Sequence, residues 1–132
     1  MKIAVNSIKK LEKVIECILK SNKKIIILSG NLGSGKTTLV KEFVKKLNLK
    51  DKATSATFSL QNIYDNKVFH YDLYNKKNEF LSLGMLEELE KDGYHFIEWG
   101  EELEEVLKMY GFDFLKVSIE VDEDKRVFEC QY

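Results

Sequence analysis

The chain has 132 residues, of which 44% are hydrophobic and 33% are charged, and its formal net charge at pH 7 is −1. This composition is that of a globular protein rather than a disordered segment, and the length predicts one domain over residues 1–132. No apolar run approaches the roughly 18–20 residues of a membrane span, and a signal-peptide pattern is absent. We therefore expect a cytoplasmic protein with no membrane association.

Charge is distributed unevenly along the chain. Residues 1–52 hold 13 lysines against 4 acidic residues, whereas residues 53–132 hold 8 basic and 18 acidic residues. The basic part suits an anionic ligand, but its lysines do not form the sustained pattern of an autonomous nucleic-acid binder. Cys17 and Cys130 have no metal-ligand spacing, and we expect both to be buried thiols in a reducing compartment.

The first elements are predicted from apolar spacing. Residues 1–5 favour a short strand, and Ser7 is expected to cap a helix whose apolar side chains share one face and which ends at Ser21 and Asn22. Residues 24–29 form an apolar, β-branched run that predicts a buried strand.

A glycine loop follows this strand directly. Residues 30–37 read GNLGSGKT, which fits the P-loop pattern G-x-x-x-x-G-K-[ST], and the apolar residues that follow recur at helical spacing. Glycines let backbone N–H groups approach phosphate oxygens at the positive end of a helix. Lys36 would then bind the β- and γ-phosphates, and the Thr37 hydroxyl would ligate Mg²⁺. A glycine turn that binds no ligand is the weaker interpretation, because both flanks also fit.

Hydroxyl side chains cluster after the P-loop helix, in residues 54–59. They either approach the γ-phosphate, as switch segments do, or form an ordinary polar entry to a strand. Residues 60–64 and 67–73 alternate as a β-hairpin does. Asp72 stands near the end of its second strand, where it would serve the metal or the attacking water, or play a structural part. His70 and His95 have no partner at ligand spacing, and both are interpreted as packing residues.

A second apolar strand is predicted at residues 94–99, after a helical pattern over residues 79–91 that Gly84 interrupts. The acid Glu98 near its end is typical of a Walker B strand, whose carboxylate faces Mg²⁺. An acidic helix over residues 101–107 follows. Two further strands, at residues 114–121 and 126–131, predict a closing hairpin that carries Arg126, the one arginine in the sequence.

Other P-loop classes fit less well. A GTPase requires D-x-x-G and N-K-x-D motifs, which the chain lacks. A small-molecule kinase usually adds an acceptor site and an arginine-rich lid, for which one arginine and 132 residues leave little room.

The chain resembles the TsaE (YjeE) family, the P-loop ATPases of bacterial threonylcarbamoyladenosine biosynthesis on tRNA. Four blocks follow the family's order. Residues 30–38 resemble its G-D-L-G-A-G-K-T-T loop, and residues 55–58 its S-P-T-[FY] segment with Ala56 for proline. Residues 70–75 resemble H-[FY]-D-L-Y-R with Asn75 for arginine, and residues 97–100 resemble I-E-W-P with Gly100 for proline.

The resemblance implies an α/β fold, a P-loop NTPase-like three-layer sandwich with a mixed central sheet. It implies ATP and Mg²⁺ as cofactors, with Thr37 and Glu98 on the metal and Lys36, Asp72 and Glu98 as the catalytic residues. The residues that it implies for nucleotide binding are Asn31, Leu32, Gly33, Ser34, Gly35, Lys36, Thr37, Thr38, Ser55, Thr57 and Arg126.

The function implied is slow, Mg²⁺-dependent ATP hydrolysis by a subunit that acts on the TsaB and TsaD proteins and reaches tRNA only through that complex. Two alternatives stay open: a nucleotide-gated binding module whose hydrolysis is vestigial, and a small P-loop kinase.

Overall fold

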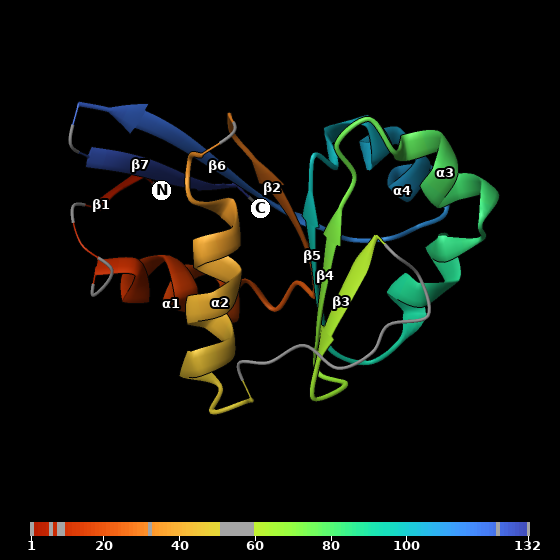
Figure 1. The fold of residues 1–132 in the computed structure, drawn as a ribbon, viewed down its shortest axis with the longest axis horizontal. Coiled ribbons are helices and arrows are strands. Elements are labelled where there is room, and N and C mark those ends of the chain that lie inside the picture. Colours follow the sequence, from red (N-terminus) through yellow and green to blue (C-terminus); the bar gives the residue numbers. More distant parts are fainter. Residues whose placement is uncertain are drawn as a thin grey trace.

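A mixed β-sheet organises the chain in the computed structural model, which describes residues 2–5, 7, 10–31, 33–50, 60–123 and 125–131 (Figure 1). Within these residues the sheet has seven strands. Their order across the sheet is β1 (Lys2–Val5), β7 (Lys125–Gln131), β6 (Leu115–Asp122), β2 (Ile25–Ser29), β5 (Tyr94–Glu98), β4 (Val68–Asp72) and β3 (Gln61–Tyr64).

Four neighbouring strands in the middle of the sheet, β6, β2, β5 and β4, run parallel to one another. The outer pairs β1–β7, β6–β7 and β3–β4 are antiparallel. The predicted mixed sheet is therefore confirmed, as are the hairpins on both sides of its parallel part. Because the carboxyl ends of parallel strands meet at one edge, the residues that follow β2, β4 and β5 come close together.

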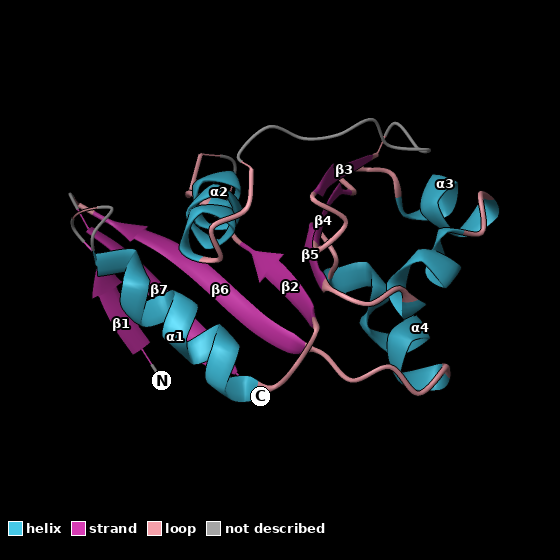
Figure 2. Cartoon of the chain, turned by 90° about the horizontal axis from the view of Figure 1, so that it is seen from below, coloured by secondary structure: helices cyan, strands magenta, loops and turns pink. Residues whose placement is uncertain are grey.

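Helices cover the two faces of the sheet. Figure 1 shows α1 (Leu11–Ser21) and α2 (Lys36–Lys46) on the same side of β7, β6 and β2, and Figures 1 and 2 show the helices that follow β4 and β5 beyond the other side of β3, β4 and β5. The second group comprises α3 (Lys77–Ser82), η2 (Met85–Glu90), η3 (Glu101–Leu103) and α4 (Glu104–Met109). The result is the expected three-layer arrangement.

Side-chain alternation along the strands builds a separate core on each face. In β2, Ile26 and Leu28 join the cluster under α1 and α2, whereas Ile25 and Ile27 join the cluster under α3, η2 and α4. A strand that is apolar on both faces is what a central parallel strand requires, and all four of these side chains are at most 4% exposed.

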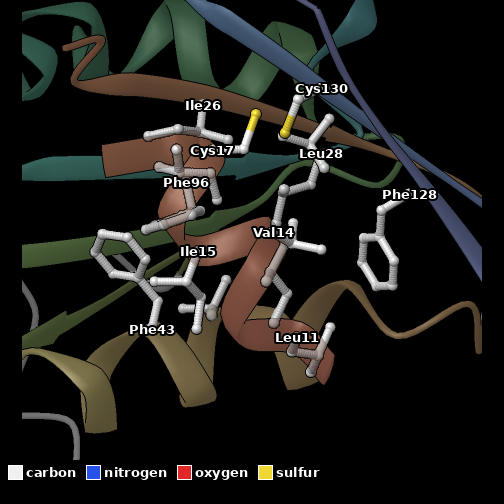
Figure 3. Packing of buried hydrophobic residues seen from close by; sticks show 14 of the residues in the cluster. Leu11, Val14, Ile15, Cys17, Ile26, Leu28, Phe43, Phe96, Phe128 and Cys130 are labelled. Atoms are coloured by element: carbon white, nitrogen blue, oxygen red, sulfur yellow. The ribbon is translucent and has the colours of Figure 1, made fainter. Parts of the chain in front are cut away.

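The two cysteines lie together in the core under α1. Cys17 on α1 and Cys130 on β7 are both buried, as expected, and their sulfur atoms point toward one another beside Leu28 (Figure 3). Burial raises the pKa of the Cys130 thiol far above its ordinary value, so this thiol stays protonated.

Two local expectations need correction or refinement. Ser7 is not the N-cap of α1, which begins at Leu11 with Lys10 before it; among the described contacts, the Ser7 carbonyl oxygen accepts a hydrogen bond from the Lys10 N–H. The helical pattern over residues 79–91 forms two short helices, because Gly84 adopts a left-handed conformation between them (φ 72°). No helix in the described part of the chain is long and apolar enough to cross a membrane.

Candidate nucleotide-binding site

The P-loop joins the end of β2 at Ser29 to the start of α2 at Lys36. Two glycines are required by its path. A Cβ on Gly30 would lie 2.7 Å from Ser34 Oγ and 2.8 Å from the Ile119 carbonyl oxygen. Gly35, the residue that precedes the first turn of α2, has φ 112°, a conformation that other residues rarely adopt. The loop therefore turns tightly and delivers the N-terminus of an 11-residue helix to the site.

Lys36 is folded back onto the loop that carries it. Its Nζ donates a hydrogen bond to the Gly30 carbonyl oxygen at 2.6 Å and lies 3.6 Å from the centre of the Trp99 ring. The side chain is buried, and this burial lowers the pKa of Lys36, although the charges of Glu98, Glu101 and Asp72 raise it. A hydrogen bond from an ammonium to a phosphate oxygen is stronger than one to a neutral carbonyl, so an anionic ligand would draw Lys36 away from its present partners.

Thr37 and Glu98 meet across the gap between α2 and β5. The Thr37 hydroxyl donates to Glu98 Oε2 at 2.9 Å, and His70 Nε2 is hydrogen-bonded to the same oxygen. Burial opposes ionisation of Glu98, but hydrogen bonds from His70 and Thr37 and the charge of Lys36 lower its pKa below the ordinary value. Glu98 is therefore an ionised carboxylate beside a hydroxyl, a donor set that suits a hard divalent cation.

Asp72 stands next to Glu98 on the neighbouring strand. The two are register partners in the parallel β4–β5 pair, so their side chains leave the sheet on the same face. Asp72 is exposed and accepts a hydrogen bond from the Tyr74 N–H through Oδ1 at 3.2 Å. Its carboxylate thus faces the site from the solvent side.

Arg126 reaches the P-loop from β7. Its Nε donates to the Ser34 carbonyl oxygen at 2.7 Å, and a second guanidinium nitrogen lies 3.4 Å from the Gly33 carbonyl oxygen. The side chain also crosses above Gly35, where an added Cβ would come within 3.3 Å of Arg126 Cδ. Arg126 therefore fixes the outer half of the loop.

These residues surround one cavity of about 630 Å³. Its lining combines apolar side chains from near both ends of the described chain with two carboxylates and Trp99. The lining residues are Val5, Ser7, Leu11, Gly33, Ser34, Gly35, Lys36, Thr37, Thr38, Asp72, Tyr74, Glu98, Trp99, Arg126 and Phe128.

Comparison with known proteins identifies the family. The sequence profile described as "Threonylcarbamoyl adenosine biosynthesis protein TsaE" matches residues 5–128. The chain belongs to the TsaE family. A Rickettsia felis protein named tRNA threonylcarbamoyladenosine biosynthesis protein TsaE is 36% identical over 126 residues, which cover 90% of this chain and 71% of the relative.

A second relative and a solved structure extend the comparison. A Bacillus subtilis protein with the same name is 34% identical over 86 residues, which cover 63% of this chain and only 54% of the relative. The chain thus spans about half the length of that TsaE protein. The crystal structure of Bacillus subtilis YdiB superposes with a TM-score of 0.67 over 97% of this chain and 82% of that chain, at 22% sequence identity. This likeness concerns the fold, and it confirms the predicted P-loop NTPase-like α/β architecture.

The structure brings together most of the residues that the sequence singled out. Lys36, Thr37, Glu98, Asp72 and Arg126 all line the cavity, as do four further P-loop residues: Gly33, Ser34, Gly35 and Thr38. Asn31 is exposed in the loop and accepts a hydrogen bond from the Ser34 N–H through its carbonyl oxygen. Leu32, Ser55 and Thr57 lie outside the described residues.

His70 is the site residue that the sequence interpretation missed. The sequence predicts that His70 packs in the core; the side chain is buried, but its Nε2 contacts the Glu98 carboxylate. The available signal was alternation: His70 stands two positions before Asp72 on one strand, so both share a face. His95 does fit the packing interpretation, because it stacks on Phe69 with ring centroids 4.5 Å apart.

The site fits a nucleotide with Mg²⁺. The start of α2 and the Lys36 ammonium suit the phosphates, and the Thr37 hydroxyl and the Glu98 carboxylate are oxygen ligands for the cation. No group of three or more His, Cys, Asp or Glu side chains in the described part of the chain could hold a metal alone. Mg²⁺ in nucleotide sites needs no such cage, since phosphate oxygens and water supply most of its ligands.

Proposed function

We propose that this TsaE family member is a Mg²⁺-dependent ATPase that takes part in threonylcarbamoyladenosine modification of tRNA and acts on the TsaB and TsaD proteins. The observation that supports it most is the 2.9 Å contact between Thr37 and Glu98. A P-loop hydroxyl and a strand-end carboxylate in contact are oxygen ligands that would hold a hard divalent cation, near the Lys36 ammonium. Bound Mg²⁺ would neutralise charge on the β- and γ-phosphates.

Each residue then has a defined part. The backbone N–H groups at the start of α2 and Lys36 would bind the phosphates, with Lys36 leaving the Gly30 carbonyl oxygen to do so. Thr37 and Glu98 would hold the cation. Asp72, an exposed residue of the cavity lining beside Glu98, would orient the attacking water.

The same geometry favours slow turnover by the isolated chain. An arginine that meets the transition state is typically worth about 10³–10⁵ in kcat. Arg126 is the one arginine of the sequence, and its guanidinium is held by carbonyl oxygens of the P-loop. Fast hydrolysis therefore requires a positively charged group from outside the chain, and we assign this increase in rate to the TsaB–TsaD complex. Contact with tRNA is likewise assigned to that complex.

The test is steady-state phosphate release with TsaB and TsaD added separately and together. We expect slow release by the chain alone, a rise when both partners are present, and loss of that rise in Glu98→Gln. Asp72→Asn should lower the stimulated rate while keeping nucleotide affinity. Glu105→Gln, an exposed carboxylate on α4, is the matched control and should behave as wild type.

Other outcomes identify other functions. A chain that binds ATP but shows no hydrolysis with either partner is a nucleotide-gated binding module. A chain that transfers the γ-phosphate to an added small molecule is a kinase. Fast release that is indifferent to TsaB and TsaD contradicts the assembly role.

A further inference from the structure

His70 and Glu98 form a buried polar pair at the centre of the site. They lie on adjacent parallel strands, where His70 is the register partner of Phe96 and Glu98 that of Asp72. Alternation therefore sends both side chains to the face of the sheet that α2 covers. His70 is 6% exposed and Glu98 is 5% exposed, so water contributes little to either group.

Two hydrogen bonds restrict the orientation of the Glu98 carboxylate. The His70 ring nitrogen Nε2 and the Thr37 hydroxyl both engage Oε2 of Glu98. Thr37 is the hydroxyl that the P-loop pattern assigns to a cation, and its oxygen lone pairs would ligate the ion while its O–H donates to Glu98. His70 is the second donor to Oε2, and its place on the strand beside Glu98 fixes the direction from which it holds the carboxylate.

We propose that His70 is a positioning residue that holds the Glu98 carboxylate in the orientation needed to bind a divalent cation together with Thr37. This inference rests on the proposed function of the site. Groups that hydrogen-bond to metal ligands orient them, and their loss typically lowers metal affinity or activity about 10–100-fold. His70 itself touches neither nucleotide nor cation in this arrangement.

A purely structural part for His70 predicts a different result. If the buried His70 side chain does no more than pack β4 against α2, replacing it would loosen the whole P-loop. Nucleotide affinity would fall equally with and without the cation. A positioning part predicts a loss confined to the dependence on Mg²⁺.

The experiment measures ADP binding by calorimetry in EDTA and at increasing Mg²⁺. In His70→Phe, which keeps an aromatic ring at this position without the donor, we expect wild-type ADP affinity in EDTA and a Mg²⁺ half-saturation about 10–100-fold higher. His70→Gln, whose side-chain amide reaches a similar distance, should restore most of the Mg²⁺ response. His95→Gln, at the other buried histidine, is the control and should match wild type.

Each result decides the inference. Wild-type Mg²⁺ dependence in a folded His70→Phe protein, or an equal loss of affinity in EDTA, overturns it. If His70→Phe does not fold, His70→Asn replaces it, since this shorter amide cannot reach Glu98 while His70→Gln can. A wild-type chain whose ADP binding ignores Mg²⁺ contradicts the proposed function instead, which separates the two failures.

Discussion

The Lys36 ammonium lies 3.6 Å from the centre of the Trp99 ring, close enough for a cation–π interaction. Trp99 is the one tryptophan in the sequence, and it lines the cavity. A ligand that draws Lys36 onto phosphate oxygens removes the charge from the indole face. We therefore expect the intrinsic fluorescence of the chain to change when Mg²⁺-ADP is added. Binding that calorimetry detects while the emission stays flat would place Trp99 outside the site.

Removal of the Lys36 charge should weaken nucleotide binding without unfolding the chain. Lys36→Ala deletes one charge-assisted hydrogen bond to phosphate, which is worth about 1.5–3 kcal/mol, or roughly 10–150-fold in Kd. Calorimetric titration with ADP measures the loss. Lys41→Ala, an exposed lysine on the same helix, is the control. Equal ADP affinity in Lys36→Ala and Lys41→Ala would contradict the assignment of the P-loop.

Arg126→Ala should also weaken ADP binding, for a different reason. The variant loses the hydrogen bond from Arg126 Nε to the Ser34 carbonyl oxygen, so the outer half of the loop is no longer held. We expect about 1 kcal/mol, the scale of one ordinary hydrogen bond, since the side chain is exposed. Lys125→Ala, the preceding residue on β7, serves for comparison. If both variants bind ADP alike, the contact does not order the loop.

Stability should fall as the solution becomes acidic through His95. Its Nδ1 is hydrogen-bonded to the Tyr71 hydroxyl and its Nε2 to the Lys91 carbonyl oxygen, both at 2.8 Å. Burial lowers the pKa of His95, although the hydrogen bond to Lys91 and the charge of Glu88 raise it. His95 therefore takes up a proton near pH 6.5 in the unfolded chain, whereas in the folded chain it stays neutral to lower pH. The free energy of unfolding consequently decreases as the pH falls below about 6.5.

Urea unfolding at pH 7.5, 6.5 and 5.5 tests this linkage. One proton gives a slope of at most about 1.4 kcal/mol per pH unit between the folded and unfolded pKa values. The His95→Gln variant lacks the titrating group and should lose less stability over the same range. Parallel pH profiles for the two proteins would show that His95 is not buried in its neutral form.

Local patterns were enough to predict most of the fold. The P-loop has its strand before it and its helix after it in the sequence, and the hairpins of β3–β4 and β6–β7 join strands that are neighbours along the chain. Glu98 at the end of β5 followed from an apolar run that ends in an acid. The start of α1 was misplaced because Ser7 has the right chemistry for a cap but stands four residues before Leu11.

Contacts between distant residues could not be predicted in the same way. His70 and Glu98 are 28 residues apart, and they meet only because β4 and β5 pair in one particular parallel register. Arg126 and Ser34 are 92 residues apart, and their contact depends on the position of β7 beside β6 and β1. Sequence spacing carries no information on how β4 pairs with β5 or on where β7 lies. The resemblance to the family therefore indicated a basic residue near the P-loop but not which atoms that residue binds.

The pairing of β1 with β7 has a consequence for the nascent chain. Val5 and Arg126 are register partners in this pair, and both line the cavity, together with Phe128. While residues 125–131 remain in the ribosome, the P-loop has already been made, but the cavity lacks one wall and the loop lacks the arginine that holds it. We therefore expect the complete site to form, and nucleotide to bind, only after β7 has emerged from the ribosome.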